Sequence, residues 1–528
     1  MLSRALMYAR FATGLPRFLR RRLTPEAARA IIERRMSSRE DNFLRLARLT
    51  VFERPESVYN ALMRDAGCEA KDIERLVRKD GLDSALRAIE KAGVRLTYDE
   101  FKGRAPLVRG GRTIEIRSDS FDNPLGTRGF ESQTTGSTGK PTRINMDLGH
   151  IESMAPMRLL SQVANGVYGW PTIVYRAGLP SSAAIGNVIQ HIVMGNPIRR
   201  WFSPVASSDL SAPLRFRLAG EMMPVVARIA GRPFPKMEIV PTTDAHIVAR
   251  AAADLVATNG HCLVRCAVST SLAVAIAAVE NGIDLTGVAF MGAAEPATPA
   301  KVRGIRQSGA RYITHFGMGE AGMVGAGCPN GIDQTDLHFM MDSLAVVPGS
   351  VRPDVDDDSV CAFAMTSLMP TAPKILINVD LGDFGILEDR HCGCLLGDLG
   401  FTQHLRQIRS TAKLTGRGVT LVGSDIARVI EEVMPSRFGG TAQDYQLVEE
   451  ENADGQTMLT LLVNPAIQVD DERAPAMLLY EELSRGRPGA SFSGAILRGG
   501  DAVKVRRERP KPNARGKQPA FRIAASTQ

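Results

Sequence analysis

The chain has 528 residues, of which 44% are hydrophobic, 23% charged and 5% aromatic, and its formal net charge is +8. This composition is typical of a globular protein and argues against disordered, collagen-like and disulfide-scaffold classes. Its 7 cysteines, an odd number in a long chain, fit a reducing compartment, so we expect a cytoplasmic protein. No apolar run is long enough to span a bilayer, and no basic and aromatic residues interleave as in nucleic-acid-binding proteins.

Arginines are concentrated at the N-terminus, where they alternate with Leu, Phe and Ala. They are Arg4, Arg10, Arg17, Arg20, Arg21 and Arg22. The segment lacks the uninterrupted apolar core and the cleavage site of a secretory signal. The pattern favours a surface helix whose arginine stems pack on its own domain. A transit peptide and a segment that contacts a membrane surface are the two alternatives.

The first hundred residues are predicted to be helical. Thr24 caps a helix that begins at Pro25, and Glu26 lies in its first turn. After residue 102 the pattern changes to the alternation of strands, which we predict at 113–116 and 142–146.

From about 150 to 405, short apolar strands alternate with helices, which predicts α/β layers. The predicted strands are 193–202, 263–268, 287–291 and 375–379, and the predicted helices are 271–281 and 299–309. After residue 408 the pattern is that of a small α+β domain. We therefore predict an α/β fold with a helical extension at 1–100, a layered domain at 101–407 and a small C-terminal domain at 408–528.

One loop is rich in hydroxyl groups and glycine. It consists of Thr134, Thr135, Gly136, Ser137, Thr138, Gly139 and Lys140. Glycines allow backbone N–H groups to surround an anion, and the hydroxyls and lysine add donors. Pro141 and a strand pattern follow, so the segment is a loop between two strands and not a Walker A motif. A generic Ser/Thr/Gly loop is the alternative.

This loop resembles the phosphate-binding motif of the adenylate-forming superfamily, which includes acyl-CoA synthetases, peptide-synthetase adenylation domains and luciferases. Later segments resemble the superfamily's other motifs in the same order. They are Gly292-Ala293-Ala294-Glu295-Pro296, Phe316-Gly317-Met318-Gly319-Glu320, Leu381-Gly382-Asp383-Phe384-Gly385, Arg409-Ser410 with Gly416-Arg417-Gly418-Val419, and Pro512-Asn513-Ala514-Arg515-Gly516-Lys517. The first of these segments is most similar to the phenylacetate–CoA ligase branch.

The resemblance implies that the protein uses ATP to convert a carboxylic acid to an acyl-adenylate, releasing pyrophosphate, and then transfers the acyl group to CoA. It implies that the 134–140 loop binds phosphates. It also implies that the 292–296 segment and Gly317 form the adenine pocket, with Phe316 stacked on the base. Asp383 would accept hydrogen bonds from the ribose hydroxyls. Glu320 would bind Mg2+, Arg409 would contact ribose and phosphate, and Lys517 would be the catalytic lysine. The superfamily also moves its C-terminal domain between the two half-reactions.

Two departures from the motifs leave alternatives open. Gly319 stands where the superfamily has a hydroxyl, and Thr411-Ala412 replaces the usual Asp pair after the crossover arginine. The adenylate could instead pass to a carrier-protein thiol or an amine, or the protein could be a degenerate nucleotide-binding protein. The resemblance favours an aryl acid, but an aliphatic or amino-substituted acid fits the sequence equally, and a homodimer is compatible with it.

Cysteine and histidine residues suggest a second feature. Cys328 and His338 follow the adenine-pocket segments, and Cys392 and Cys394 follow Asp383. Three thiolates and one imidazole would form a closed structural zinc site. The alternatives are buried cysteines without a metal, or His391 in place of His338. His315 is either a structural histidine or part of the acyl pocket, because it precedes Phe316.

Overall fold

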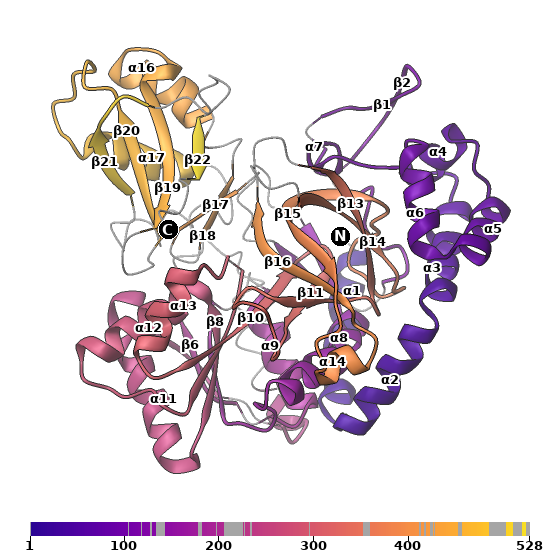
Figure 1. The fold of residues 1–528 in the computed structure, drawn as a ribbon, viewed down its shortest axis with the longest axis horizontal. Helices are drawn as coiled ribbons and strands as arrows, with labels where there is room; N and C mark the ends of the chain where they lie inside the picture. Colours follow the sequence, from indigo (N-terminus) through magenta and orange to yellow (C-terminus); the bar gives the residue numbers. More distant parts are fainter. Residues whose placement is uncertain are drawn as a thin grey trace.

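The computed structural model describes residues 2–103, 105–117, 119–126, 129–133, 143–177, 182–196, 198–204, 225, 227–232, 235–294, 296–351, 359–410, 413–416, 419–422, 426, 428–451, 457–484, 503–510 and 520–523. Figure 1 shows a central sheet region, a helical block at the right and a C-terminal unit at the upper left. Within the described residues, no helix combines the length and the apolar character needed to cross a membrane.

The N-terminal helix α1 (Leu2–Leu19) packs against its own chain. Phe11, Leu15 and Leu19 are buried in a core that also contains residues of the later helices α8 and α9. This packing supports the surface-helix interpretation of the arginine-rich segment, because these three apolar side chains are already covered by the chain's own core.

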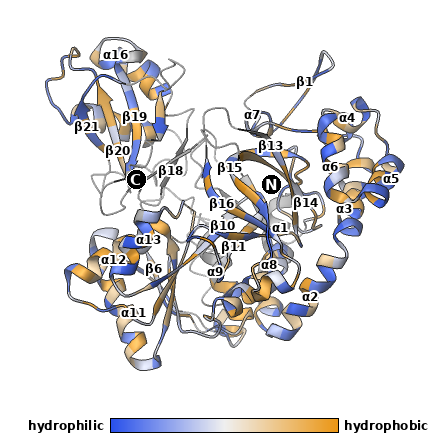
Figure 2. Cartoon of the chain, in the orientation of Figure 1, coloured by the Kyte–Doolittle hydropathy of each residue, from blue (hydrophilic) through white to orange (hydrophobic). Residues whose placement is uncertain are grey.

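Six short helices and one π-helical turn form the helical block. They are α2 (Pro25–Ser37), α3 (Arg39–Ala47), η1 (Arg48–Phe52), α4 (Val58–Asp65), α5 (Ala70–Asp80), α6 (Leu82–Lys91) and α7 (Tyr98–Phe101). The expected start of α2 is confirmed, since Ala27 N donates to Thr24 Oγ1 at 3.2 Å. Figure 2 shows hydrophilic and hydrophobic stretches on the same helices, as one buried face requires.

A 12-stranded sheet forms the centre, in the order β13-β14-β15-β16-β12-β11-β10-β9-β8-β5-β6-β7. The half from β7 to β10 is parallel. Its strands are β5 (Thr172–Tyr175), β6 (Ile198–Ser203), β7 (Met237–Ile239), β8 (Cys262–Ala267), β9 (Val288–Ala293) and β10 (Arg311–Met318).

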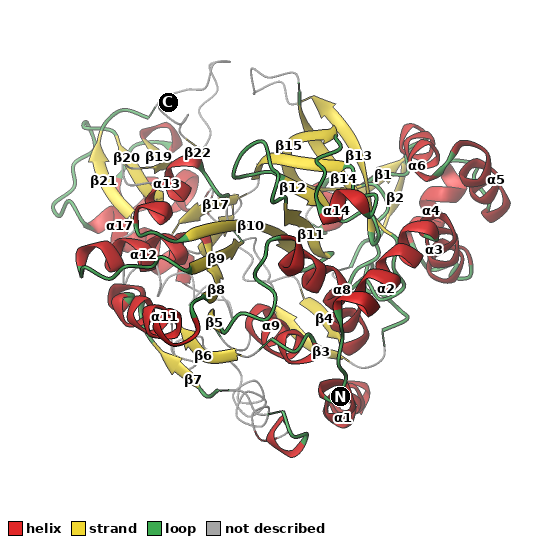
Figure 3. Ribbon diagram, turned by 60° about the horizontal axis from the view of Figure 1, so that its bottom comes forward, coloured by secondary structure: helices red, strands yellow, loops and turns green. Residues whose placement is uncertain are grey.

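Helices cover both faces of this parallel half, which buries the strands on both sides. They are α8 (Leu148–Ala164), α9 (Ser182–Val193), α11 (His246–Asn259), α12 (Val268–Glu280) and α13 (Pro299–Gln307), with the turn η2 (Thr242–Asp244). Figure 3 shows α11, α12 and α13 on one face and α9 on the other.

The other half of the sheet is antiparallel. Its strands are β11 (Gly322–Gly327), β12 (Leu337–Phe339), β13 (Leu344–Val351), β14 (Val360–Ser367), β15 (Val379–Asp389) and β16 (Gln403–Ser410), with the short helix α14 (Leu395–Asp398). Three hairpins stand apart from it: β1 (Leu107–Arg109) with β2 (Arg112–Ile114), β3 (Gly129–Gln133) with β4 (Arg143–Asp147), and β17 (Lys413–Gly416) with β18 (Val419–Val422).

The C-terminal unit has a four-stranded sheet in the order β21-β20-β19-β22. Its elements are η3 (Val429–Val433), α16 (Met434–Phe438), η4 (Ala442–Asp444), β19 (Tyr445–Glu451), β20 (Thr457–Val463), α17 (Ala474–Ser484), β21 (Val503–Arg507) and β22 (Phe521–Ile523). Helices and strands pack around a core of their own. The predicted fold class, a large layered α/β part followed by a small α+β part, is confirmed.

Three strand predictions need correction. Of residues 113–116, only 113 and 114 belong to a strand, β2. Residues 193–202 begin at the last residue of α9, and only 198–202 belong to a strand, β6. Residues 375–378 are a buried connection, and β15 begins at Val379. The connection is not a strand because side chains satisfy its backbone: Tyr59 Oη donates to Ile375 O and accepts from Ile377 N, both at 3.1 Å.

Candidate active site

The two segments that resemble adenine-pocket motifs meet at the carboxyl ends of two neighbouring strands. Gly292 and Ala293 end β9, and Phe316 and Gly317 lie near the end of β10. The parallel register pairs Thr314 with Gly292, so Phe316 is level with Ala294. Carboxyl ends of parallel strands are the usual place for ligands in α/β sheets.

The backbone of the first segment is unusual at two positions. A Cβ on Gly292 would lie 2.5 Å from Tyr312 Oη, so any larger residue there would require the Tyr312 side chain to move. Ala294 has a φ of 77°, a left-handed conformation that costs a non-glycine residue about 1–3 kcal/mol and that is concentrated at functional sites. Pro296 is half-buried, and Glu295 lies outside the described residues.

The second segment turns sharply into β11. The register of β10 and β11 shifts between Phe316 and Gly317, and a Cβ on Gly317 would lie 3.0 Å from Gly322 O. Glu320 lies in the turn between these strands and is only 7% exposed. The bulge and the turn bring a nearly buried carboxylate beside the strand ends.

A lysine that sequence reasoning missed contacts this carboxylate. Lys102 Nζ lies 2.5 Å from Glu320 Oε1, and both side chains are 10% exposed. Lys102 directly follows α7, and its ammonium also lies 5.6 Å from the centre of the Phe101 ring. The two partners are 218 residues apart, so no local pattern could have linked them.

Asp383 and Arg409 lie on neighbouring strands, β15 and β16, in a second part of the sheet. The antiparallel register pairs Asp383 with Ser410 and Phe384 with Arg409. Asp383 is 7% exposed, and Arg409 is partly buried. In the sheet order, β12 and β11 lie between this pair of strands and β10. A backbone hydrogen bond links the connection that leads into β15 with the turn after β10: Lys374 N donates to Glu320 O at 3.3 Å.

Several predicted site residues lie outside the described residues. They are the 134–140 loop, Glu295 and Lys517. The strands that flank the loop are described, and Gln133 pairs with Arg143 across the β3–β4 hairpin. The two strands on either side of the predicted loop are therefore antiparallel neighbours.

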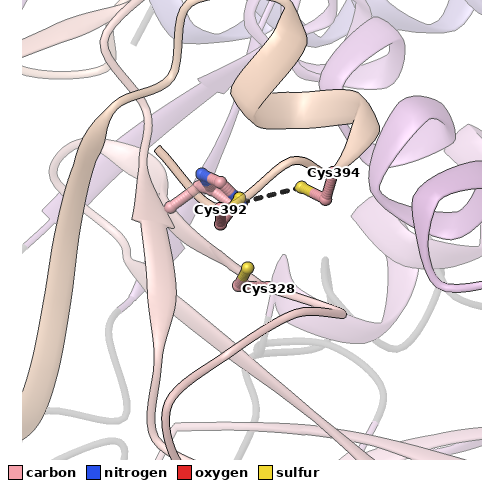
Figure 4. Close-up of side chains that lie close together, drawn as sticks. Cys328, Cys392 and Cys394 are labelled. Carbon is pink, nitrogen blue, oxygen red and sulfur yellow. Dashed lines mark hydrogen bonds between the residues drawn. The ribbon is translucent and has the colours of Figure 1, made fainter. Parts of the chain in front are cut away.

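The structure brings the four predicted metal ligands together. The ligand atoms of Cys328, His338, Cys392 and Cys394 all lie within 4.8 Å of one another. His338 Nε2 lies 3.1 Å from Cys394 Sγ and 3.6 Å from Cys392 Sγ. Figure 4 shows the three labelled thiols pointing into the same space. We call these four residues the Cys3His cluster.

The chemistry of the cluster fits a zinc ion. His338 Nδ1 lies 2.8 Å from Phe401 O, so a ring N–H donated there leaves the Nε2 lone pair facing the thiols. The hydrogen bond with Cys328 lowers the pKa of Cys394 to about 3 despite its burial, and the bond with His338 adds to this. Burial raises the pKa of Cys392, and hydrogen bonding with Cys394 raises that of Cys328. Ligand atoms on a tetrahedral zinc lie roughly 3.5–4 Å apart, close to the spacing found here.

A buried network of Asp336, Arg390 and His404 lies next to His338 of the cluster. Asp336 Oδ1 lies 2.6 Å from His404 Nδ1, and Arg390 contacts the other oxygen of the same carboxylate. The His404 ring lies 4.3 Å from the His338 ring, centre to centre. These contacts fix the strand β12 that presents His338.

Comparison with known proteins gives a structural likeness only. No known protein family and no curated protein matches the sequence. The fold is similar to 2-hydroxyisobutyryl-CoA ligase solved with 2-HIB-AMP and CoA in the thioesterification state. That likeness has a TM-score of 0.56 at 15% identity and covers 93% of this chain and 90% of the ligase.

Two other solved structures are similar at TM-scores below 0.5. They are an open conformation of the same ligase (0.47, 14% identity, 93% of this chain and 91% of that one) and a mutant amide bond synthetase from Marinactinospora thermotolerans (0.41, 13% identity, 87% and 91%). The comparison with a TM-score of 0.56 covers 93% of this chain, so nearly the whole chain has the fold of a CoA ligase that was solved with an acyl-adenylate.

Proposed function

We propose that the protein uses ATP to activate a carboxylic acid as an acyl-adenylate, releases pyrophosphate and transfers the acyl group to CoA. One observation carries the proposal. The residues that resemble adenylate-binding motifs cluster at strand ends β9 and β10 and at the β15–β16 pair, in a chain with a CoA ligase fold. Motif and fold are independent lines of support.

The described residues suit the roles we assign to them. Phe316 is partly buried and would stack on adenine, beside the tight Gly292 backbone. The nearly buried carboxylate of Asp383 would accept from the ribose hydroxyls, and Arg409 would contact ribose and phosphate. Attack of a carboxylate on the α-phosphate joins two anions, so fixed positive charge lowers the barrier. We propose that Lys517 supplies this positive charge and that the 134–140 loop binds the pyrophosphate that leaves.

Mg2+ would neutralise the phosphates, and Glu320 offers the carboxylate oxygen that this ion prefers. Lys102 already lies on one oxygen of that carboxylate. A metal at this position would therefore share Glu320 with the ammonium of Lys102 or displace it.

The finer assignments are part of the same proposal. We propose an aryl or related acid, as in the phenylacetate–CoA ligase branch, CoA as acceptor, and a structural Zn2+ in the Cys3His cluster. The cluster joins the end of β11, the strand β12 and the loop before α14, so the zinc would stabilise the fold rather than react.

Acid-dependent ATP–pyrophosphate exchange tests the activation step. We expect exchange with one class in a panel of aryl, aliphatic and amino acids. ATP binding without exchange for any acid would contradict the proposal. The acceptor is then identified in mixtures that contain CoA, a carrier protein or an amine as the single acceptor, and we expect product with CoA.

A further inference from the structure

Arginine and histidine side chains gather on the face of the parallel sheet that α8 and α9 cover. They are Arg158 on α8, Arg176 after β5, His191 on α9, Arg265 on β8 and His315 on β10. We call these five residues the arginine cluster. The adenylate-binding residues identified above do not include any of them.

The strand registers place the cluster in two layers beneath the adenine segment. Arg265 is level with Met291 and Val174 of the neighbouring strands. Ile313 is also level with Met291, and His315 lies two residues beyond Ile313 on the same strand. Arg176 likewise lies two residues beyond Val174. His315 and Arg176 are therefore one layer nearer the carboxyl ends of the strands than Arg265. Two residues of strand span roughly 7 Å. The cluster therefore extends inward from the edge where Phe316 lies.

The inner members of the cluster are almost fully buried. His191 is 0% exposed and Arg265 is 4% exposed, and Arg265 Nη1 donates to His191 Nε2 at 3.2 Å. Arg176 Nη2 donates to Cys266 O at 2.7 Å, which holds this guanidinium beside β8. These bonds leave the positive charges near one another inside the protein.

Electrostatic effects agree with this geometry. Burial lowers the pKa of Arg265 well below its ordinary value, and Arg158 and Arg176 lower it further. Burial, followed by Arg176, lowers the pKa of Arg158 to about 10. Burial and the three arginines also hold the pKa of His315 well below its ordinary value. Buried groups that repel one another in this way are concentrated at functional sites.

The charge on Arg265 has no matching carboxylate in the part of the chain that the structure describes. No described Asp or Glu forms an ion pair with Arg265, and neither Arg265 Nε nor either ring nitrogen of His315 has a described hydrogen-bond partner. Buried donors of this kind are normally satisfied, and a ligand can satisfy them. A guanidinium matches a carboxylate in shape as well as charge.

We propose that the acid substrate carries a second carboxylate, and that the arginine cluster binds it. The first carboxylate would then lie near the strand ends, where adenylation takes place. This inference rests on the proposed function, and it narrows the substrate to dicarboxylic acids whose two groups are separated by several ångströms.

Matched acids and one substitution test the proposal. The probes are succinate, glutarate, adipate and homophthalate, each compared with its monomethyl ester in pyrophosphate exchange and in calorimetric binding without ATP. We expect one diacid to exceed its ester in kcat/KM by roughly 10- to 100-fold. Arg265→Met should remove this preference by lowering exchange with the diacid far more than exchange with the ester, while the exposed Arg250→Met control should keep it.

The outcomes separate the two proposals. Exchange without any preference for a diacid, or an equal loss with acid and ester in a folded Arg265→Met protein, would overturn the inference but leave the proposed function intact. Diacid binding that depends on Arg265 without any exchange would support the inference and overturn the proposed function. If Arg265→Met does not fold, the comparison of acid and ester on the wild type decides alone.

Discussion

At the scale of single residues, Lys517 has the most specific assigned role. We expect Lys517→Ala to lower adenylation by about 100- to 1000-fold, the usual effect of removing one donor that stabilises a developing charge. Transfer of a supplied acyl-adenylate to CoA should continue at the wild-type rate, because that step does not use the lysine. Pyrophosphate exchange and thioester formation measured on the same preparations would check this, and equal loss of both would contradict the role.

Glu320 and Lys102 form a pair whose structural and catalytic roles can be separated. Glu320→Gln removes the carboxylate charge that the nearly buried ammonium of Lys102 contacts and should cost about 3 kcal/mol of folding free energy. The double variant Lys102→Met/Glu320→Gln removes both charges, so it should regain most of that stability. Adenylation should stay low in both variants if Glu320 contributes to phosphate neutralisation. Denaturant unfolding and pyrophosphate exchange are the two measurements.

An exposed ion pair provides the control for this cycle. Arg200 Nη2 lies 2.7 Å from Glu238 Oε2, and the two side chains are 41% and 46% exposed. Glu238→Gln should change stability by less than about 1 kcal/mol, since exposed pairs contribute little.

Recovery of adenylation in the double variant Lys102→Met/Glu320→Gln would show that Glu320 acts only through its pairing with Lys102.

At the scale of elements, the short helix α7 positions Lys102. Glu100 accepts from Thr97 N at 2.9 Å, which completes a capping box at the start of the helix. The same carboxylate accepts from Arg109 Nη1 at 2.8 Å. Burial raises the pKa of Glu100, but the hydrogen bond from Arg109 and those from Thr97 outweigh it, so the net shift is downward. The ionised carboxylate therefore stabilises the fold.

This shift gives a pH-dependent prediction. A carboxyl whose pKa is lowered by folding stabilises the protein above its unfolded pKa, about 4.3 for Glu, and loses that contribution as the pH falls through the folded pKa. Glu100→Gln should therefore cost about 1–2 kcal/mol at pH 7 and progressively less below about pH 4. Unfolding curves at several pH values would check this. The exposed Glu115→Gln serves as control, and a penalty for Glu100→Gln that does not change with pH would contradict the argument.

The Cys3His cluster joins elements that are distant in sequence. Cys392→Ser should remove zinc and lower stability together, because a structural zinc contributes its binding energy to the fold. We expect the metal content to fall from about one zinc per chain to near zero, with a loss of about 2 kcal/mol or more. Elemental analysis and thermal unfolding are the measurements. Cys68→Ser, at a partly buried cysteine outside the cluster, should change neither. Wild-type protein of full stability without zinc would rule out the metal.

Elements with regular backbone pairing could be predicted from the sequence, and those fixed by distant side chains could not. The end of β9 and the start of α2 follow from local patterns of apolar, capping and glycine residues. The apolar run 375–378 resembles a strand equally well, but Tyr59, more than 300 residues away in the chain, takes up its backbone groups. Lys102 and the inner members of the arginine cluster were missed for the same reason, since only the folded chain brings them to the site.

At the scale of the whole molecule, the chain contains cores that do not share residues. The core of the C-terminal unit is built from Ile426 to Ala520, whereas the cores of the large sheet use residues up to Leu405. The strand β16 completes the large sheet at Ser410, three residues past the expected domain boundary of 407. A part with its own core and few shared contacts can fold alone. The two parts should therefore be separable just after β16.

This separation predicts how the reaction is divided between the parts. A chain that ends at Ser410 keeps Phe316, Glu320, Asp383 and Arg409 and loses Lys517. We expect it to unfold cooperatively and to bind ATP, and to lose at least about 100-fold in pyrophosphate exchange. Calorimetry gives the first two quantities, and full-length Lys517→Ala is the matched comparison, since both proteins lack the same charge. Undiminished exchange by the shortened chain would place all of the adenylation chemistry in the large part and remove the role we assign to the C-terminal unit.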